Sequence, residues 1–226
     1  MKSIIPNAMT ALNLVLGMFA IFSMLNDSFI TASILIFSAL VVDGLDGRVA
    51  RFYGVSSEFG KELDSLCDLV SFGVAPALLA YLFSLQQYGL LGGFVAAAFA
   101  TCGALRLARF NVNTGVVKGY FMGLPIPTAG CVVATFVMTG INPAAWMFLL
   151  FVTFFAYLMI STIRYPDFKG KGGEPVRPVA AILAVSISCY IIYIAPQGIL
   201  FALFFGYSLF GIFNTFLGLL SRSPAT

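Results

Sequence analysis

The chain alternates between long apolar runs and short polar segments over its whole length. A helix that crosses a bilayer needs about 20 mostly apolar residues, and eight runs approach or reach this length. Helices in lipid are apolar on every side, so the polar breaks rather than a helical period separate them. The sequence predicts an all-α integral membrane protein, a polytopic helix bundle in one domain over residues 1–226. Its predicted spans are residues 7–25, 29–52, 63–83, 87–109, 126–140, 143–163, 177–194 and 197–218.

Positively charged residues give this bundle a direction. If the N-terminus lies inside, all 12 Lys and Arg residues fall on inner segments, and the outer segments near residues 26–28, 85–87, 140–142 and 195–197 carry none. Cytoplasmic loops of membrane proteins hold an excess of Lys and Arg. We therefore expect both termini on the cytoplasmic side of the cell (inner) membrane.

Composition excludes several classes of function. Hydrophobic residues make up 60% of the chain and charged residues 9%, whereas a soluble domain has about 25% charged residues. The 12 basic and 9 acidic residues nearly balance, and no basic cluster indicates a nucleic-acid partner. The first apolar run lacks a small-residue cleavage site before Asn26, so we expect a retained helix rather than a signal peptide.

The side chains available for catalysis are also restricted. The chain has no histidine, the most common general base and metal ligand, so any such chemistry must use carboxylates, lysine, tyrosine or cysteine. Four cysteines stand singly inside apolar runs, at positions 67, 102, 131 and 189. Without a Cys-x-x-Cys pair, they are predicted to be packing residues rather than disulfide partners or zinc ligands.

Four of the nine acidic residues lie inside apolar helical sequence. Asp43 and Asp46 are three residues apart and Asp64 and Asp68 are four apart, so each pair shares one face of its helix. The segment between the pairs is short enough to fold the two helices back as antiparallel neighbours. We expect the four carboxylates to converge just below the cytoplasmic surface. The other acids are predicted to be solvated or to cap helix ends, at positions 27, 58, 62, 167 and 174.

A group of carboxylates inside a membrane is costly and usually marks a functional site. These four repel one another, and too few cations lie nearby to neutralise them. Mg²⁺ or Mn²⁺ prefers carboxylate oxygen and keeps positions open for phosphate, and two such ions can hold a pyrophosphate between them. We therefore predict a two-metal site; the alternative is a set of structural polar residues satisfied within the bundle. Gly47 and Gly60 allow a close backbone approach to a ligand, and Arg51 can pair with a phosphate.

Residues 43–68 read DGLDGRVARFYGVSSEFGKELDSLCD. They fit the pattern D-x-x-D-G-x-x-A-R, eight residues, then G-x-x-x-D-x-x-x-D at every fixed position. This resembles the defining motif of the CDP-alcohol phosphotransferase family. The resemblance implies a homodimeric enzyme in which two divalent metal ions are bound by Asp43, Asp46, Asp64 and Asp68.

The same resemblance implies roles for further residues. Asp68 matches the proposed general base, and contacts with the CDP-linked lipid fall on Gly47, Arg51, Ser57 and Gly60. In the first helix, residues 6–10 read PNAMT and resemble the family's Asn-x-x-Thr nucleotide contact. Asn7 and Thr10 are therefore expected to contact the CDP group, with helix N-capping as the alternative.

Three other segments resemble the branch of the family whose acceptor is L-serine. They are GALRLARFN at 103–111, GLPIPTAG at 123–130, and STIRYP at 161–166 together with Phe168-Lys169. This resemblance implies CDP-diacylglycerol as donor, with phosphatidylserine and CMP as products. Glycerol 3-phosphate and inositol phosphate are the alternative acceptors within the family.

The fourth predicted helix ends in polar residues on the aspartate side of the membrane. Arg106, Arg109 and Asn111 are candidates there for binding the serine carboxylate and steering its hydroxyl. The alternative is that both arginines reach to lipid head groups, as Lys118, Lys169 and Lys171 are predicted to do.

Two functions outside the family also use membrane carboxylates. A membrane prenyltransferase acts on a diphosphate with Mg²⁺, but its aspartates lie in two separated motifs, whereas this chain has one compact motif. A cation transporter has its site near the bilayer midplane, often within repeats. Here the buried acids lie toward one face, and the sequence shows no repeat.

Overall fold

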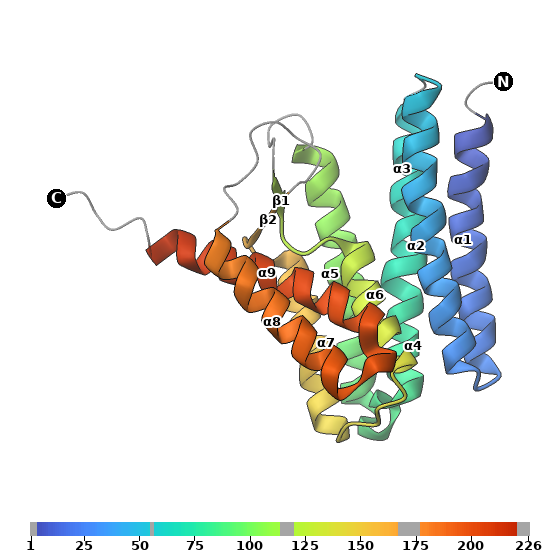
Figure 1. Cartoon of the computed structure of the whole chain (residues 1–226). Coiled ribbons are helices and arrows are strands. Elements are labelled where there is room, and N and C mark those ends of the chain that lie inside the picture. Colours follow the sequence, from blue (N-terminus) through green and yellow to red (C-terminus); the bar gives the residue numbers. More distant parts are fainter. Residues whose placement is uncertain (1–3, 55–56, 114–119, 167–176, 221–226) are drawn as a thin grey trace.

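The structure is a computed structural model and describes residues 4–54, 57–113, 120–166 and 177–220. It consists almost entirely of helices (Figure 1). The α-helices are α1 (Ile4–Leu25), α2 (Phe29–Phe52), α3 (Glu58–Asp68), α4 (Ala75–Phe83), α5 (Leu90–Asn113), α6 (Ile126–Met138), α7 (Ala145–Ile160), α8 (Pro178–Ile194) and α9 (Ile199–Leu220). The shorter elements are the π-helical turn η1 (Leu69–Val74), the 3₁₀ turns η2 (Leu85–Tyr88) and η3 (Pro196–Gly198), and the strands β1 (Tyr120–Met122) and β2 (Arg164–Pro166).

Helix α1 packs against both α2 and α3 at one edge of the molecule (Figure 1). A tight turn joins α1 to α2, and Asp27 takes a left-handed conformation there with φ 54°, which a short polar side chain tolerates. Ser57 caps α3, because its hydroxyl accepts a hydrogen bond from the Gly60 backbone N–H at 3.0 Å. The aspartates of α2 and α3 are therefore carried on neighbouring helices.

In the structure the third predicted span is one continuous helical segment from Glu58 to Phe83. Its middle, η1, is π-helical. Pro76 lies at the start of α4 and has no N–H to donate to a preceding carbonyl. Helix α6 packs closely on this turn: a Cβ on Gly130 would lie 2.6 Å from the Phe72 carbonyl oxygen. Such π turns inside helices often occur at functional sites, and this one directly follows Asp68.

A two-stranded ribbon lies beside the last turns of α5. Strands β1 and β2 pair antiparallel, with Phe121 opposite Tyr165. At the end of β1, Gly123 has φ 78°, a conformation that glycine adopts without strain. Three-residue strands are too short to show an alternating pattern, so the sequence did not predict this ribbon.

Helix α6 runs through the centre of the molecule and touches α2, α4 and α9. Nine of its residues are buried, and the large side chains of the core, such as Phe72, Phe99, Phe148 and Phe155, are fully enclosed. Cys67 and Cys131 are buried thiols, as expected of packing residues, whereas Cys102 is half-buried and Cys189 is exposed.

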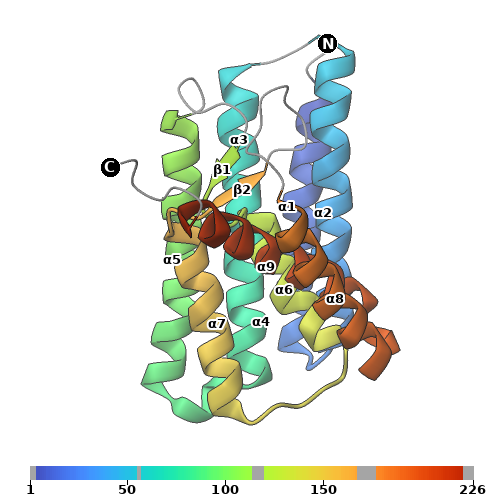
Figure 2. The same cartoon turned by 60° about the vertical axis from the view of Figure 1, so that its left-hand side comes forward.

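Helices α8 and α9 form a hairpin that packs on α6, and Phe204 of α9 meets Phe37 of α2 with ring centres 6.2 Å apart. The two views agree that this hairpin is steeply inclined to the upright helices (Figures 1 and 2). Helix α9 contacts α6 and β2, whereas α8 packs mainly on α9 and η3. Many side chains of α8 are exposed, among them Ile182, Val185 and Tyr193.

All eight predicted spans correspond to helices, which confirms the predicted fold class. The boundaries of several were wrong: the third begins at Glu58 rather than 63, and the fourth begins at Leu90 after η2 and continues to Asn113. Within the part of the chain that the structure describes, five helices are long and apolar enough to cross a membrane. Helices α6, α7 and α8 are apolar but shorter, with 13, 16 and 17 residues.

Candidate active site

Three carboxylates form a compact group where α2 meets α3. One oxygen from each of Asp43, Asp64 and Asp68 lies within 4.8 Å of the other two. Asp68 is buried, and Asp43 and Asp64 are half-buried. The i, i+4 spacing in α3 and the antiparallel course of α2 produce this meeting, as the sequence predicted.

The group has the chemistry and dimensions of a site for a hard cation. Mg²⁺ binds oxygen at 2.0–2.1 Å, so two oxygens on opposite sides of one ion are about 4.2 Å apart. Two ionised carboxylates at such separations repel by about 3 kcal/mol at an effective dielectric constant near 20. A divalent cation among them removes this repulsion. Asp43, Asp64 and Asp68 therefore fit a divalent metal site.

The fourth predicted ligand, Asp46, lies outside this three-residue group. Its Oδ2 accepts a hydrogen bond from the Thr10 hydroxyl at 2.7 Å, and both residues are buried. In the structure the Thr10 hydroxyl holds Asp46 against α1; its expected contact with the nucleotide stays a prediction. Asp46 still shares its helix face with Asp43, so Thr10 fixes the direction of the carboxylate that approaches the site from α2.

Asn13 is a site residue that the sequence analysis missed. It is fully buried, and its Nδ2 donates to Asp68 Oδ1 at 3.1 Å. Its backbone carbonyl accepts from the Ser71 hydroxyl at 2.9 Å, which ties α1 to η1. Its own side-chain oxygen has no hydrogen-bond partner among the residues that the structure describes, and a buried orphan of this kind indicates a site that also receives a ligand. Polar residues at positions 7, 10 and 13 of an apolar helix were the available signal.

The predicted donor contacts gather where α1 and α3 begin. A Cβ on Gly60 would lie 3.2 Å from the Asn7 side-chain oxygen and 3.1 Å from the Ser57 hydroxyl oxygen. Asn7, Ser57 and Gly60 are thus neighbours, and glycine at 60 permits this closeness. On α2, the Arg51 guanidinium lies over Gly47, 3.6 Å from where a Cβ would be. The first group lies at the starts of α1 and α3, and the second group lies toward the end of α2. The starts of α1 and α3 and the end of α2 lie at one end of the bundle (Figure 1).

Arg106 is a buried cation beside the carboxylates. It is 6% exposed, and its Nε has no hydrogen-bond partner. The guanidinium carbon lies 5.1 Å from the ring centre of Phe110 and 5.9 Å from that of Phe121, which are favourable distances for cation–π attraction. The negative charge of Asp68 also attracts it. A fixed, desolvated guanidinium here is well suited to bind an anionic group.

Arg109 has a different environment from Arg106. Its guanidinium donates hydrogen bonds to the carbonyls of Met122, Met159, Ile160 and Ser161 at 3.0–3.2 Å. These bonds join α5 to β1 and to the end of α7. The contacts favour a structural role for Arg109 over the predicted contact with the acceptor.

Asn111 also connects helices. Its Nδ2 donates to the Ser65 hydroxyl at 2.9 Å, and its backbone carbonyl accepts from the Lys61 ammonium at 3.3 Å. The end of α5 is therefore held against α3, one turn from Asp64 and Asp68. Lys118, Lys169 and Lys171, predicted to contact head groups, lie outside the described residues.

Comparison with known proteins identifies this arrangement. Residues 3–163 match the CDP-alcohol phosphatidyltransferase family. A CDP-diacylglycerol–serine O-phosphatidyltransferase of Helicobacter pylori is 43% identical over 171 residues, covering 73% of this chain and 72% of the relative. The enzyme of the same name from Bacillus subtilis is 37% identical over 170 residues, covering 75% and 94%.

An archaeal relative carries a different name. The archaetidylserine synthase of Methanothermobacter thermautotrophicus is 39% identical over 173 residues, covering 75% of this chain and 72% of its own length. Residues 3–163, which match the family, include the aspartate motif and α5, which hold the site described above.

Proposed function

Because the chain belongs to the CDP-alcohol phosphatidyltransferase family, we propose that it transfers the phosphatidyl group of CDP-diacylglycerol to L-serine, giving phosphatidylserine and CMP. The observation that carries the proposal is the group of Asp43, Asp64 and Asp68 beside the buried Arg106. The names of the relatives support serine as the acceptor. Family membership also sets aside the prenyltransferase and the cation transporter.

The carboxylates provide the site for two divalent ions, Mg²⁺ or Mn²⁺, when these are bound. We propose that Asp43, Asp46, Asp64 and Asp68 are the ligands. In such sites the ions neutralise the pyrophosphate and stabilise the attacking and leaving oxygens. The hydrogen bond from Thr10 to Asp46 fixes one of these ligands before substrate arrives.

Asp68 is proposed to act as the general base. It lies within the carboxylate group and is oriented by Asn13. It accepts the proton of the serine hydroxyl as that oxygen attacks the lipid-side phosphorus. The bond between this phosphorus and the bridging oxygen breaks, and CMP leaves with that oxygen.

The donor is proposed to bind with its cytidine and phosphates between the first turns of α1 and α3 and the last turns of α2. Asn7, Ser57 and Gly60 form one side of this space, and Gly47 and Arg51 form the other. The acyl chains stay in the bilayer. Arg51 is exposed and lies near the end of α2. Its guanidinium can therefore stay hydrogen-bonded to the phosphate of CMP as CMP leaves.

The acceptor is proposed to bind through its carboxylate to Arg106. Cation–π contacts with the rings of Phe110 and Phe121 hold the guanidinium in place, and its Nε, which has no hydrogen-bond partner among the described residues, can donate to the acceptor. Arg109 and Asn111 would then support the acceptor site indirectly, by fixing α5 against α3, β1 and α7. A carboxylate at Arg106 places the serine hydroxyl on the side of Asp68.

The cellular setting is part of the same proposal. The distribution of Lys and Arg in the sequence supports an active site on the cytoplasmic side of the cell (inner) membrane. The family resemblance supports a homodimer. The chain is proposed to act as a single membrane domain. Because the hydrocarbon chains of the donor remain in lipid, both diacyl and ether-linked donors are compatible with this site.

The deciding experiment measures CMP release by the purified protein in detergent with CDP-diacylglycerol and Mg²⁺ or Mn²⁺. Serine, glycerol 3-phosphate, inositol phosphate and ethanolamine are each supplied as acceptor. We expect release with serine to exceed release with the others by at least tenfold, and chelation to abolish it. Preference for glycerol 3-phosphate or inositol phosphate would overturn the serine assignment and leave the family chemistry intact.

A further inference from the structure

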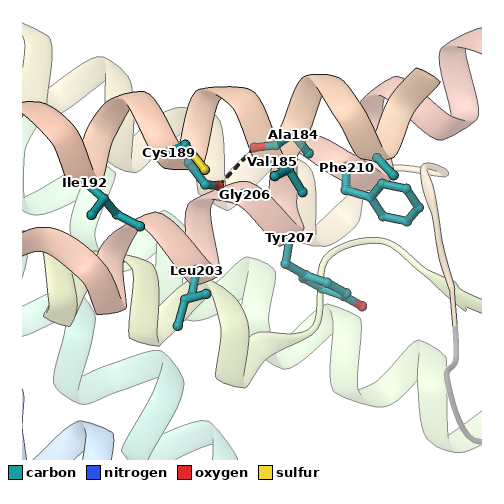
Figure 3. Close-up of a pocket in the computed structure, with 10 residues that line it drawn as sticks. Ala184, Val185, Cys189, Ile192, Leu203, Gly206, Tyr207 and Phe210 are labelled. Atoms are coloured by element: carbon teal, nitrogen blue, oxygen red, sulfur yellow. Dashed lines mark hydrogen bonds between the residues drawn. The ribbon is translucent and has the colours of Figure 1, made fainter. Parts of the chain in front are cut away.

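Helices α8 and α9 line an open apolar pocket of about 440 Å³ (Figure 3). Ala181, Ala184 and Ile192 line it from α8, and Leu203, Gly206 and Phe210 line it from α9. The Ser188 hydroxyl in its wall lies within hydrogen-bonding distance of the Ala184 and Ala202 carbonyls, at 2.9 and 3.0 Å. The pocket therefore offers an almost purely hydrocarbon surface. It also lies outside the part of the chain that matches the family, which ends at residue 163.

A cation stands at one end of this pocket. Arg177 precedes α8 and lies one turn before Ala181, whose N–H donates to the Arg177 carbonyl at 3.2 Å. It continues the lining stripe of α8, because the steps 177, 181, 184 and 188 follow the helical repeat. Its guanidinium donates to the carbonyl of Asn214, one turn beyond Phe210 on α9, at 2.8 Å. Arg177 is thus held where the two lining stripes end.

We propose that α8 and α9 bind one anionic phospholipid of the surrounding bilayer, with an acyl chain in the apolar pocket and the phosphate at Arg177. The dimensions agree with this occupant. From Ala181 to Ile192 the pocket follows 11 residues of α8, or about 17 Å at 1.5 Å per residue. One leaflet of a bilayer provides about 15 Å of hydrocarbon. Arginine forms strong charge-assisted hydrogen bonds to phosphate oxygens.

Two other occupants fit less well. A helix of a second copy is about 10 Å wide, whereas α8 and α9 are already in direct contact across the pocket through Ser188 and Ala202. The CDP-linked donor has its pyrophosphate at the aspartates of α2 and α3. Although Phe37 of α2 contacts Phe204 of α9, every residue that lines the pocket belongs to α8 or α9, and none belongs to α2 or α3. A separate lipid is the occupant that both facts allow.

The first test fills the pocket. Val185 lines it and is 60% exposed, whereas Ile182 lies on the same helix, is 64% exposed and does not line it. Full-length protein is stripped of lipid in detergent and titrated with dioleoyl phosphatidylglycerol, and bound lipids are counted by native mass spectrometry. Val185→Trp is expected to lose one tightly bound lipid per protomer, and Ile182→Trp to retain it. Equal lipid counts in the two variants would overturn the proposal, as would a change in protomer number in place of lipid loss.

The second test addresses the charge. Titrations with phosphatidylglycerol and with zwitterionic phosphatidylcholine are compared in the native chain, Arg177→Gln and Arg177→Lys. A cation near the membrane surface contributes about fivefold to the affinity for an anionic lipid. The glutamine variant is expected to lose this preference and the lysine variant to keep it. If the native chain binds both lipids equally, or if the lysine variant fails as the glutamine variant does, Arg177 does not recognise phosphate. CMP release is not used as a readout, so this result is independent of the proposed enzymatic activity.

Discussion

At Asp68, three features meet in one carboxylate. It is buried, it lies within 4.8 Å of two other carboxylates, and it accepts a hydrogen bond from Asn13. Replacement by asparagine keeps an oxygen to accept that bond and removes the basic group. Asp68→Asn is therefore expected to fold normally and to lower CMP release by about 10²- to 10⁴-fold, the usual contribution of general acid–base catalysis.

The measurement is CMP release at saturating CDP-diacylglycerol, serine and Mg²⁺. Asp27→Asn is the matched control, because Asp27 lies in the turn at the opposite end of α1 and α2 and should keep full activity. Melting of the two variants in detergent is compared with that of the native chain. Full turnover by Asp68→Asn would exclude its role as the base.

Arg106 and Arg109 are one helical turn apart, but we expect different effects on serine binding and on stability when each is replaced. Arg106→Gln removes the cation proposed to bind the serine carboxylate, a charge-assisted interaction usually worth about 1.5–3 kcal/mol. The KM for serine is expected to rise roughly 10- to 100-fold, with little change in the KM for CDP-diacylglycerol. Arg106→Lys keeps the charge but loses the planar guanidinium that contacts the rings of Phe110 and Phe121, so an intermediate KM is expected.

Arg109→Gln is the contrasting variant. It leaves the carbonyls of Met122, Met159, Ile160 and Ser161 without their donor. A loss of stability of about 3 kcal/mol or more is expected, seen as a lower melting temperature in detergent. An unchanged serine KM in Arg106→Gln, or a serine-specific KM effect in Arg109→Gln without loss of stability, would reverse the two roles.

At the scale of elements, the contact between α1 and η1 holds Asn13 in position to donate to Asp68. Gly17 lies one turn after Asn13, and a Cβ at position 17 would meet Ser71, lying 2.9 Å from its Cα. Gly17→Ala is expected to push α1 from η1 and to disturb the bonds from Asn13 to Asp68 and from Ser71 to Asn13. Small displacements of catalytic groups cost up to about 100-fold in rate, so we expect a 10- to 100-fold loss of CMP release.

Gly93→Ala is the control for this variant. Its Cβ would meet Tyr81 at 3.9 Å, an ordinary van der Waals distance, and it lies in the first turn of α5. The variant should keep native activity, and the helix propensity of this first turn should rise slightly. Equal activity of the two alanine variants would show that the close α1–η1 contact is not required.

The sequence predicted the elements better than their details, for physical reasons that differ from case to case. Apolar runs and Lys/Arg placement located every helix, because burial in lipid dominates their composition. The early start of α3 was missed because its first turn, from Glu58 to Glu62, is polar and extends beyond the apolar run. The π turn depends on Pro76 together with close packing by α6, and no local pattern reports a tertiary contact.

In the candidate site, too, the sequence predicted some features and not others. The spacings of the aspartates predicted that they share helix faces, and three of the four meet within 4.8 Å. The bond from Thr10 to Asp46 and the four carbonyls at Arg109 join segments far apart in the chain. Spacing along one helix contains no information on such partners. Asn13 alone had a readable signal, as the third member of a polar series on one face of α1.

At the scale of the whole molecule, the site residues lie toward one end of the bundle. In both views, α1 and α3 begin and α2 ends on the same side, and η2 lies on the other (Figures 1 and 2). A water-soluble acceptor and a CMP product then need access from one compartment. The proposed cytoplasmic orientation makes this compartment the interior, where no translocation of serine is required.

Orientation can be measured with single cysteines at the two ends. Glu58 begins α3 on the site side, Gln86 lies in η2 on the opposite side, and both are exposed. Right-side-out vesicles that carry Glu58→Cys or Gln86→Cys are treated with a membrane-impermeant maleimide before and after permeabilisation. The native chain gives the background, because its exposed Cys189 lies on the apolar α8, out of reach of a charged reagent in water. We expect Gln86→Cys to react in sealed vesicles and Glu58→Cys to react after opening. Since the two positions are at opposite ends of one molecule, the reverse pattern would place the aspartates at the outer surface and require serine to be supplied from outside.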